Sequence, residues 1–105
     1  MEEISVEELA IWRKDSKPFI LLDVREPHEI ATASISGATC IPMAEIPVRA
    51  SELERTANIA VMCHHGGRSA HIAQLLGMMG FDHVYNVDGG INAYSERIDS
   101  NIPTY

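Results

Sequence analysis

The sequence has few cysteines, few basic residues and no long apolar run. Its two cysteines, Cys40 and Cys63, are too few for a disulfide framework and lack the spacing of a zinc site, which suits a reducing compartment. Lys and Arg number 8 against 15 Asp and Glu, a formal net charge of −7 that argues against nucleic acid as a partner. No stretch approaches the roughly 20 apolar residues that a membrane helix needs. The acidic residues 1–4 also lack the features of a secretory leader. We therefore expect a cytoplasmic protein with no membrane partner.

The length and the even composition predict one domain that spans residues 1–105. A chain of this size can bury roughly 60–70% of its unfolded surface without disulfides or a structural metal. No repeat, linker or low-complexity tract interrupts the sequence. We therefore expect one domain and no metal site.

Short apolar runs alternate with helical patterns along the chain. The runs are too brief for helices and rich in branched residues, which is typical of buried parallel strands. Between them, apolar residues recur at helical spacing, and a capping box at residues 5–8 starts the first helix. We expect strands at 19–22, 39–41, 58–62 and 83–87, helices at 6–14, 27–30, 44–53, 68–79 and 91–98, and a polar surface tail at 99–105. The alternation predicts an α/β fold with a mostly parallel sheet covered on both faces.

The segment Cys63–Ser69 joins a buried strand to the N-terminus of a helix. Cys63 then stands at the carboxyl end of a strand, where open α/β sheets bind ligands. Gly66 and Gly67 can turn their amide groups inward, and Arg68 adds a permanent cation. A helix N-terminus also favours negative charge, so these groups are expected to stabilise a thiolate on Cys63. The segment predicts a sulfur nucleophile inside an anion-binding loop.

Four ordered motifs resemble those of single-domain rhodaneses. They are Leu21–Glu26, Gly37-Ala38 with Ile41-Pro42, Cys63–Ser69 and Asp88–Tyr94. The resemblance implies a rhodanese-like three-layer α/β/α fold with a mostly parallel five-stranded sheet. It also implies a thiosulfate sulfurtransferase that needs no cofactor. In that family a cysteine, here Cys63, takes a sulfane sulfur from thiosulfate or a persulfide donor and passes it to cyanide or a thiol. A thioredoxin-like or sulfur-carrier protein would be a natural acceptor.

The resemblance and the loop chemistry together assign roles to individual residues. Thiosulfate is a dianion, so Arg68 and the loop amides are expected to hold it for attack and to stabilise the departing sulfite. Where many family members carry cations, this chain has two histidines, so we expect a weaker attraction for thiosulfate and a pH dependence. Asp23 and Arg25 are expected to support the loop through a buried ion pair. The predicted catalytic residues are Cys63 and Arg68, and the predicted substrate-binding residues are His64, His65, Gly66, Gly67, Arg68 and Ser69.

Loop length separates this hypothesis from its nearest alternatives. Four residues lie between Cys63 and Arg68, whereas rhodanese-fold phosphatases and arsenate reductases have five, which makes room for a tetrahedral oxyanion. The shorter loop favours a single sulfur atom. A phosphatase, an arsenate reductase and a persulfide-binding or regulatory module without turnover stay open as alternatives. For Arg68 a structural salt bridge is the alternative role. Cys40 is expected to be a small packed side chain, with a resolving cysteine as the minority interpretation.

Overall fold

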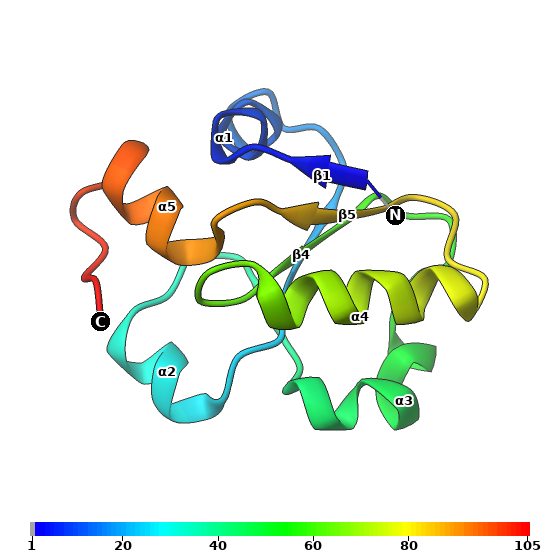
Figure 1. Ribbon diagram of the computed structural model, residues 1–105. Coiled ribbons are helices and arrows are strands. Elements are labelled where there is room, and N and C mark those ends of the chain that lie inside the picture. Colours follow the sequence, from blue (N-terminus) through cyan, green and yellow to red (C-terminus); the bar gives the residue numbers. More distant parts are fainter. Residues whose placement is uncertain (1) are drawn as a thin grey trace.

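The computed structural model describes residues 2–105 as a five-stranded sheet between two layers of helices (Figure 1). All strands are parallel and lie in the order β1-β5-β4-β2-β3. The strands are β1 (Glu2–Ile4), β2 (Ile20–Asp23), β3 (Thr39–Cys40), β4 (Ile59–Met62) and β5 (Val84–Val87). The predicted three-layer α/β/α fold is thereby confirmed, and the sheet is parallel throughout instead of mostly parallel.

Strand β1 is the one strand that the apolar pattern did not predict. It has three residues, of which two are exposed glutamates, so only Ile4 gives it an apolar signal. Its backbone nevertheless pairs with β5, with Glu2 opposite Tyr85 and Ile4 opposite Val87. Long-range pairing therefore forms a strand where the local sequence reads as a polar terminus.

Within residues 2–105, five α-helices cover the sheet. Ser5 caps the first of them as expected, because its hydroxyl accepts a hydrogen bond from the Glu8 amide at 3.1 Å. The predicted helix 44–53 is instead one short α-helix between two 3₁₀ turns, 43–45 and 50–52. Pro47 lies in the first turn of that helix, where its missing N–H costs no hydrogen bond. The helices are α1 (Val6–Lys14), α2 (Pro27–Thr32), α3 (Ile46–Arg49), α4 (Gly67–Met78) and α5 (Gly90–Arg97).

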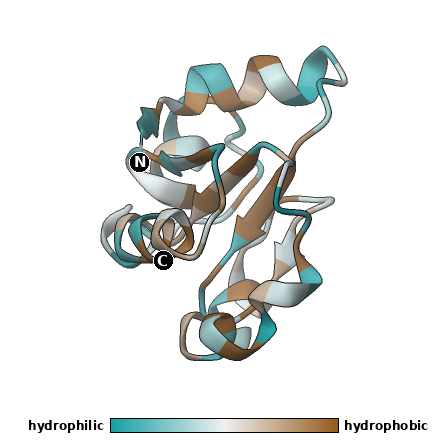
Figure 2. Cartoon of the chain, turned by 90° about the vertical axis from the view of Figure 1, so that its right-hand side faces the viewer, coloured by the Kyte–Doolittle hydropathy of each residue, from teal (hydrophilic) through white to brown (hydrophobic). Residues whose placement is uncertain are grey.

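Successive strand residues supply two separate hydrophobic clusters, one on each face of the sheet. Leu22 and Val61 pack with α3 and α4, whereas their neighbours Leu21 and Met62 pack with α1 and α5. Figure 2 shows the apolar strands between the more mixed helices. Burial on both faces explains why these strands read as continuous apolar runs.

The carboxyl edge of the sheet gathers the polar side chains of the middle strands. Asp23 ends β2, Cys63 follows β4 directly, and Asn86 lies near the end of β5. Helices α2, α4 and α5 all begin at this same edge. Within residues 2–105, no helix has the length and apolar character needed to cross a bilayer.

Candidate active site at the carboxyl edge of the sheet

Cys63 lies almost fully buried, 1% exposed, at the start of the loop that leads into α4. Gly66 is the N-cap of α4 and has a φ of +109°, a conformation that favours glycine. Its N–H donates to Cys63 Sγ at 3.1 Å. The first helical bond of α4 runs from the Ala70 N–H to the Gly66 carbonyl, so the amides of residues 67–69 precede the helical ladder. The sulfur therefore sits at a helix N-terminus that favours negative charge.

Ser69 and Asn86 form a buried polar support next to the sulfur. Ser69 Oγ lies 3.3 Å from Cys63 Sγ and 2.5 Å from Asn86 Oδ1. The Asn86 amide group donates to the Gly66 carbonyl at 3.2 Å and to Glu3 Oε2 at 2.8 Å. Because the amide nitrogen donates twice, Asn86 Oδ1 is left as an acceptor for the Ser69 hydroxyl. The strand β5 thus fixes both the serine and the turn at Gly66.

The N-terminus of α5 holds the backbone of the loop from the other side. The Ile91 N–H donates to the Cys63 carbonyl at 2.9 Å, and the Asn92 N–H donates to the His64 carbonyl at 3.1 Å. Gly90 has a φ of +60°, and a Cβ on it would lie 2.4 Å from the Cys63 carbonyl oxygen. Only glycine fits this approach, so the Asp88–Tyr94 motif has a direct role in shaping the loop.

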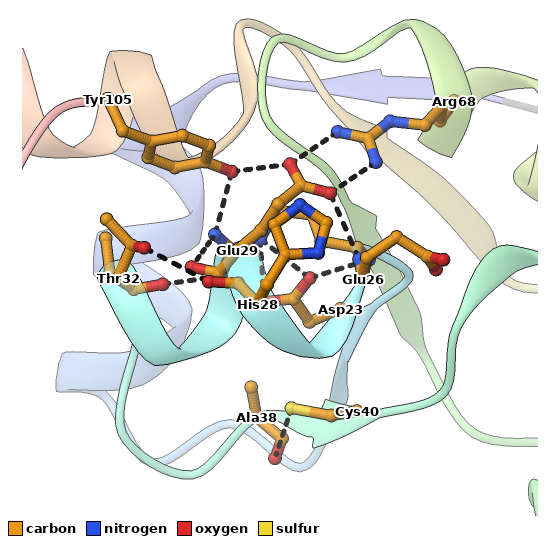
Figure 3. Close-up of polar contacts among 11 residues, drawn as sticks. Asp23, Glu26, His28, Glu29, Thr32, Ala38, Cys40, Arg68 and Tyr105 are labelled. Carbon is orange, nitrogen blue, oxygen red and sulfur yellow. Dashed lines mark hydrogen bonds and ion pairs between the residues drawn. The ribbon is translucent and has the colours of Figure 1, made fainter.

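Arg68 is held by Glu29, a residue of α2 that the sequence interpretation did not assign to the site. The guanidinium makes two parallel bonds to the carboxylate, of 2.6 Å and 2.8 Å (Figure 3). Hydrogen bonding to Arg68 holds the pKa of Glu29 well below its usual range, and the same pairing raises the pKa of Arg68. The cation expected to face a dianion is therefore charge-compensated in this structure.

Asp23 and Arg25 form a fully buried ion pair with a shortest N–O distance of 2.7 Å. Arg25 also donates to the carbonyl oxygens of Glu29, at 3.3 Å, and of Ala33, at 2.8 Å. The pair thus anchors the end of β2 to α2, and among the described residues neither side chain forms a hydrogen bond to the loop residues 63–68. Its support reaches the loop through α2, which carries Glu29 to Arg68.

His64 lies between two other rings at the mouth of the loop. The Tyr105 ring stacks on it at 3.8 Å with an interplanar angle of 4°, and the His65 ring lies 3.9 Å away at 33°. Burial lowers the pKa of His64, and the neighbouring His65 lowers it further. The His64 Nε2 atom is buried and has no hydrogen-bond partner within residues 2–105. A neutral imidazole with one unused nitrogen thus lines the loop.

The comparisons with known proteins agree with this geometry. Residues 5–97 match the family model described as rhodanese-like domain. The chain therefore belongs to the rhodanese-like family. This confirms the resemblance drawn from the four motifs.

Relatives align with most or all of this rhodanese-like domain. A sulfurtransferase of Allochromatium vinosum is 35% identical over 92% of this chain and 91% of that protein. The rhodanese-like/PpiC domain-containing protein 12 of Arabidopsis thaliana, named as chloroplastic, is 40% identical over 100% of this chain, which spans 38% of its length. The crystal structure of a rhodanese-like domain protein from Staphylococcus aureus is similar with a TM-score of 0.86 and 30% identity, over 100% of this chain and 99% of that one.

Cys40 is exposed in this rhodanese-like domain, so its prediction as a packed side chain was wrong. It ends β3, which lies at the edge of the sheet and has two residues, both exposed. An edge strand has one neighbour only, so it leaves its side chains less covered than a central strand does. Burial and the nearby Asp23 carboxylate nevertheless raise the pKa of the Cys40 thiol. Both cysteines are free thiols.

An open cavity of about 380 Å³ lies beside the sulfur loop, between the 3₁₀ turn before α3 and the face of α4. Its walls are largely apolar, and Arg68 belongs both to this cavity and to the loop. The lining residues are Glu26, Met43, Ala44, Pro47, Arg68, His71, Ile72 and Leu75. A ligand body of small organic size fits such a space.

Three residues of the site were missed by the sequence interpretation. Asn86 carries a usable signal, because it is a polar residue inside an apolar strand that ends at the ligand edge. Glu29 lies in the first turn of α2, beyond the end of β2, which is a weaker signal. Tyr105 carries none, since its place depends on how the tail residues 99–105 fold back. The tail lies largely on the surface as expected, with Tyr105 41% exposed, and Tyr105 also contacts α2 and the loop.

Proposed function

We propose that this rhodanese-like domain is a sulfurtransferase that carries a sulfane sulfur on Cys63 as a persulfide. The observation that carries the proposal is the environment of Cys63 Sγ, which is buried at the N-terminus of α4. There it accepts the Gly66 N–H at 3.1 Å and lies 3.3 Å from Ser69 Oγ. The sulfurtransferase name of the Allochromatium vinosum relative supports the same chemistry.

The proposed reaction has two displacements on sulfur. The Cys63 thiolate attacks the sulfane sulfur of thiosulfate, a new S–S bond forms, and sulfite leaves with the electron pair of the broken bond. An acceptor, cyanide or a thiolate, then attacks the outer sulfur of the persulfide, and the electron pair of that S–S bond returns to Cys63 Sγ. Thiocyanate or a new persulfide is released. No external oxidant or reductant is needed in either step.

The loop suits the charged intermediate of this reaction. The outer sulfur of a persulfide is negative, and the amides that precede the helical ladder of α4 can donate to it. The four residues between Cys63 and Arg68 leave less room than the five of the phosphatase and arsenate reductase loops. The bidentate bond to Glu29 also occupies the guanidinium of Arg68. These features favour sulfur transfer over chemistry on a tetrahedral oxyanion.

The charge around the loop bears on the choice of sulfur donor. Arg68 is balanced by Glu29 and Arg25 by Asp23, so these pairs offer no uncompensated cation to a dianion. We therefore expect a singly charged persulfide donor to compete well with thiosulfate. The apolar cavity beside Arg68 would accept the organic part of a thiol or the surface of a thioredoxin-like or sulfur-carrier protein. We keep the cytoplasm as the expected compartment, on the ground of the two free thiols.

Formation of thiocyanate from thiosulfate or a persulfide donor and cyanide tests the proposal. Wild-type protein should form thiocyanate, Cys63→Ser should form none, and the matched variant Cys40→Ser should retain the wild-type rate. Equal activity in wild type and Cys63→Ser would refute the assignment. Phosphate esters and arsenate should give no turnover that depends on Cys63, and a fast rate with either would favour the alternative.

A further inference from the structure

Tyr105 connects two parts of the sulfur site that lie far apart in the sequence. Its hydroxyl donates to Glu29 Oε2 at 2.8 Å and accepts from Arg25 Nη1 at 2.9 Å (Figure 3). Its ring stacks on His64, the residue after the nucleophile. Burial and the bond to Glu29 raise the pKa of Tyr105, so the phenol keeps the proton that it donates. The Tyr105 side chain thus contacts His64 in the loop and the charged side chains of Arg25 and Glu29.

The stacking geometry encloses His64. Two rings at 3.8 Å and 3.9 Å from one imidazole must lie on its opposite faces, because two rings at these distances would overlap on one face. The Tyr105 ring therefore covers one face and His65 covers the other. The His64 Nε2 atom is itself buried, although the residue as a whole is only half-buried. A buried nitrogen without a partner costs free energy unless a ligand completes its bonding.

We infer that Tyr105 is a positioning residue of the sulfur site: its ring holds His64 at the loop mouth, and its hydroxyl fixes the Glu29 carboxylate that binds Arg68. The inference rests on the proposed sulfur transfer at Cys63. It adds a specific role for the tail, which then forms one wall of the site. The two parts of the side chain act differently, since the ring sets the environment of His64 and the hydroxyl sets the orientation of Arg68 through Glu29.

Two substitutions separate these parts. Tyr105→Phe keeps the stacked ring and removes both hydrogen bonds, whereas Tyr105→Ala removes the ring as well. Tyr85→Phe is the matched control, because Tyr85 lies against Trp12 on the α1 side of the sheet. The first readout is the titration of His64 by NMR on protein without any donor. The second is the division of the thiosulfate-to-cyanide rate into kcat and donor KM.

The His64 titration tests the ring. The groups that face this imidazole are His65, Tyr105, Glu29 and Arg68, from the loop, the tail, α2 and α4. Tyr105→Ala should raise the pKa of His64 toward its ordinary value of about 6.5, because the ring no longer shields the imidazole from water. Tyr105→Phe and the control should leave it unchanged. An unshifted His64 titration in Tyr105→Ala would overturn the inference, even if no sulfur transfer were found.

The kinetics test the hydroxyl. Tyr105→Phe should raise the donor KM by roughly three- to tenfold, the size expected for the loss of one ordinary hydrogen bond, with kcat nearly unchanged. Tyr105→Ala should raise it at least as much. If both variants lose thermal stability only, with donor KM equal to that of the control, Tyr105 is a packing residue and the inference is wrong. If the wild type transfers no sulfur from any donor, the proposed function fails. The His64 titration then still tests whether the Tyr105 ring positions His64.

Discussion

The pairing of Arg68 with Glu29 gives a prediction whose size follows from the structure. In Glu29→Gln the carboxylate that accepts two bonds from Arg68 becomes an amide with one oxygen and an NH₂ group. The NH₂ group would face a guanidinium that can only donate, so one of the two hydrogen bonds is lost. The other is weakened, because its acceptor is then a neutral amide oxygen. The Glu29 side chain is 10% exposed and that of Arg68 is 35% exposed. The pair is therefore shielded on the acidic side and partly hydrated on the basic side.

Breaking a fully buried pair costs about 3–5 kcal/mol, and the partial exposure of Arg68 places this one lower, at about 2 kcal/mol. For a domain of this size the melting temperature should fall by roughly 10 °C, which calorimetry at pH 7 would measure. The pKa of Glu29 lies well below its usual range in the folded protein. The stabilisation is therefore complete above the unfolded value of about 4.3 and is lost as the pH falls from there through the folded pKa.

The stability gap between wild type and Glu29→Gln should accordingly be the same at pH 7 and pH 5.5 and shrink below about pH 4. Glu45→Gln is the matched control, because its ion pair with Arg49 is exposed and should add nothing measurable. A gap that is absent at pH 7, or one that does not change down to pH 2, would refute the argument that this ion pair stabilises the site.

Four further substitutions test the framework of the site. Gly90→Ala places a Cβ 2.4 Å from the carbonyl of the nucleophile and should cost more than about 3 kcal/mol in urea unfolding; Gly37→Ala, with φ +86° and open space around it, should cost only about 1–2 kcal/mol. Arg25→Met leaves the buried Asp23 carboxylate unpaired and should cost about 3–5 kcal/mol, and a smaller loss would mean that water or another donor replaces the guanidinium. Cys40→Ser should retain wild-type kinetics and sulfur loading, since Cys40 is an exposed edge residue; a slower variant would give this thiol a redox role.

The sequence predicts the central strands and the nucleophile loop because both are encoded locally. An apolar run predicts a strand buried on both faces from the local sequence alone. Two glycines between a cysteine and an arginine likewise predict an anion-binding loop. Strand β1 and the tail are different, since Glu2 and Tyr105 acquire their places only from partners more than 40 residues away in the chain. The partner of Arg68 was missed for the same reason, because the short helix at 27–30 was predicted but only the folded sheet brings Glu29 next to Arg68.

The central claim is that Cys63 carries the transferred sulfur, and mass spectrometry of the protein after exposure to thiosulfate or a persulfide donor tests it most directly. The account predicts the added mass of one sulfur atom on the peptide that contains Cys63, and loss of this mass when cyanide is added. Added sulfur on Cys40 instead, or no added sulfur with any donor, would contradict it.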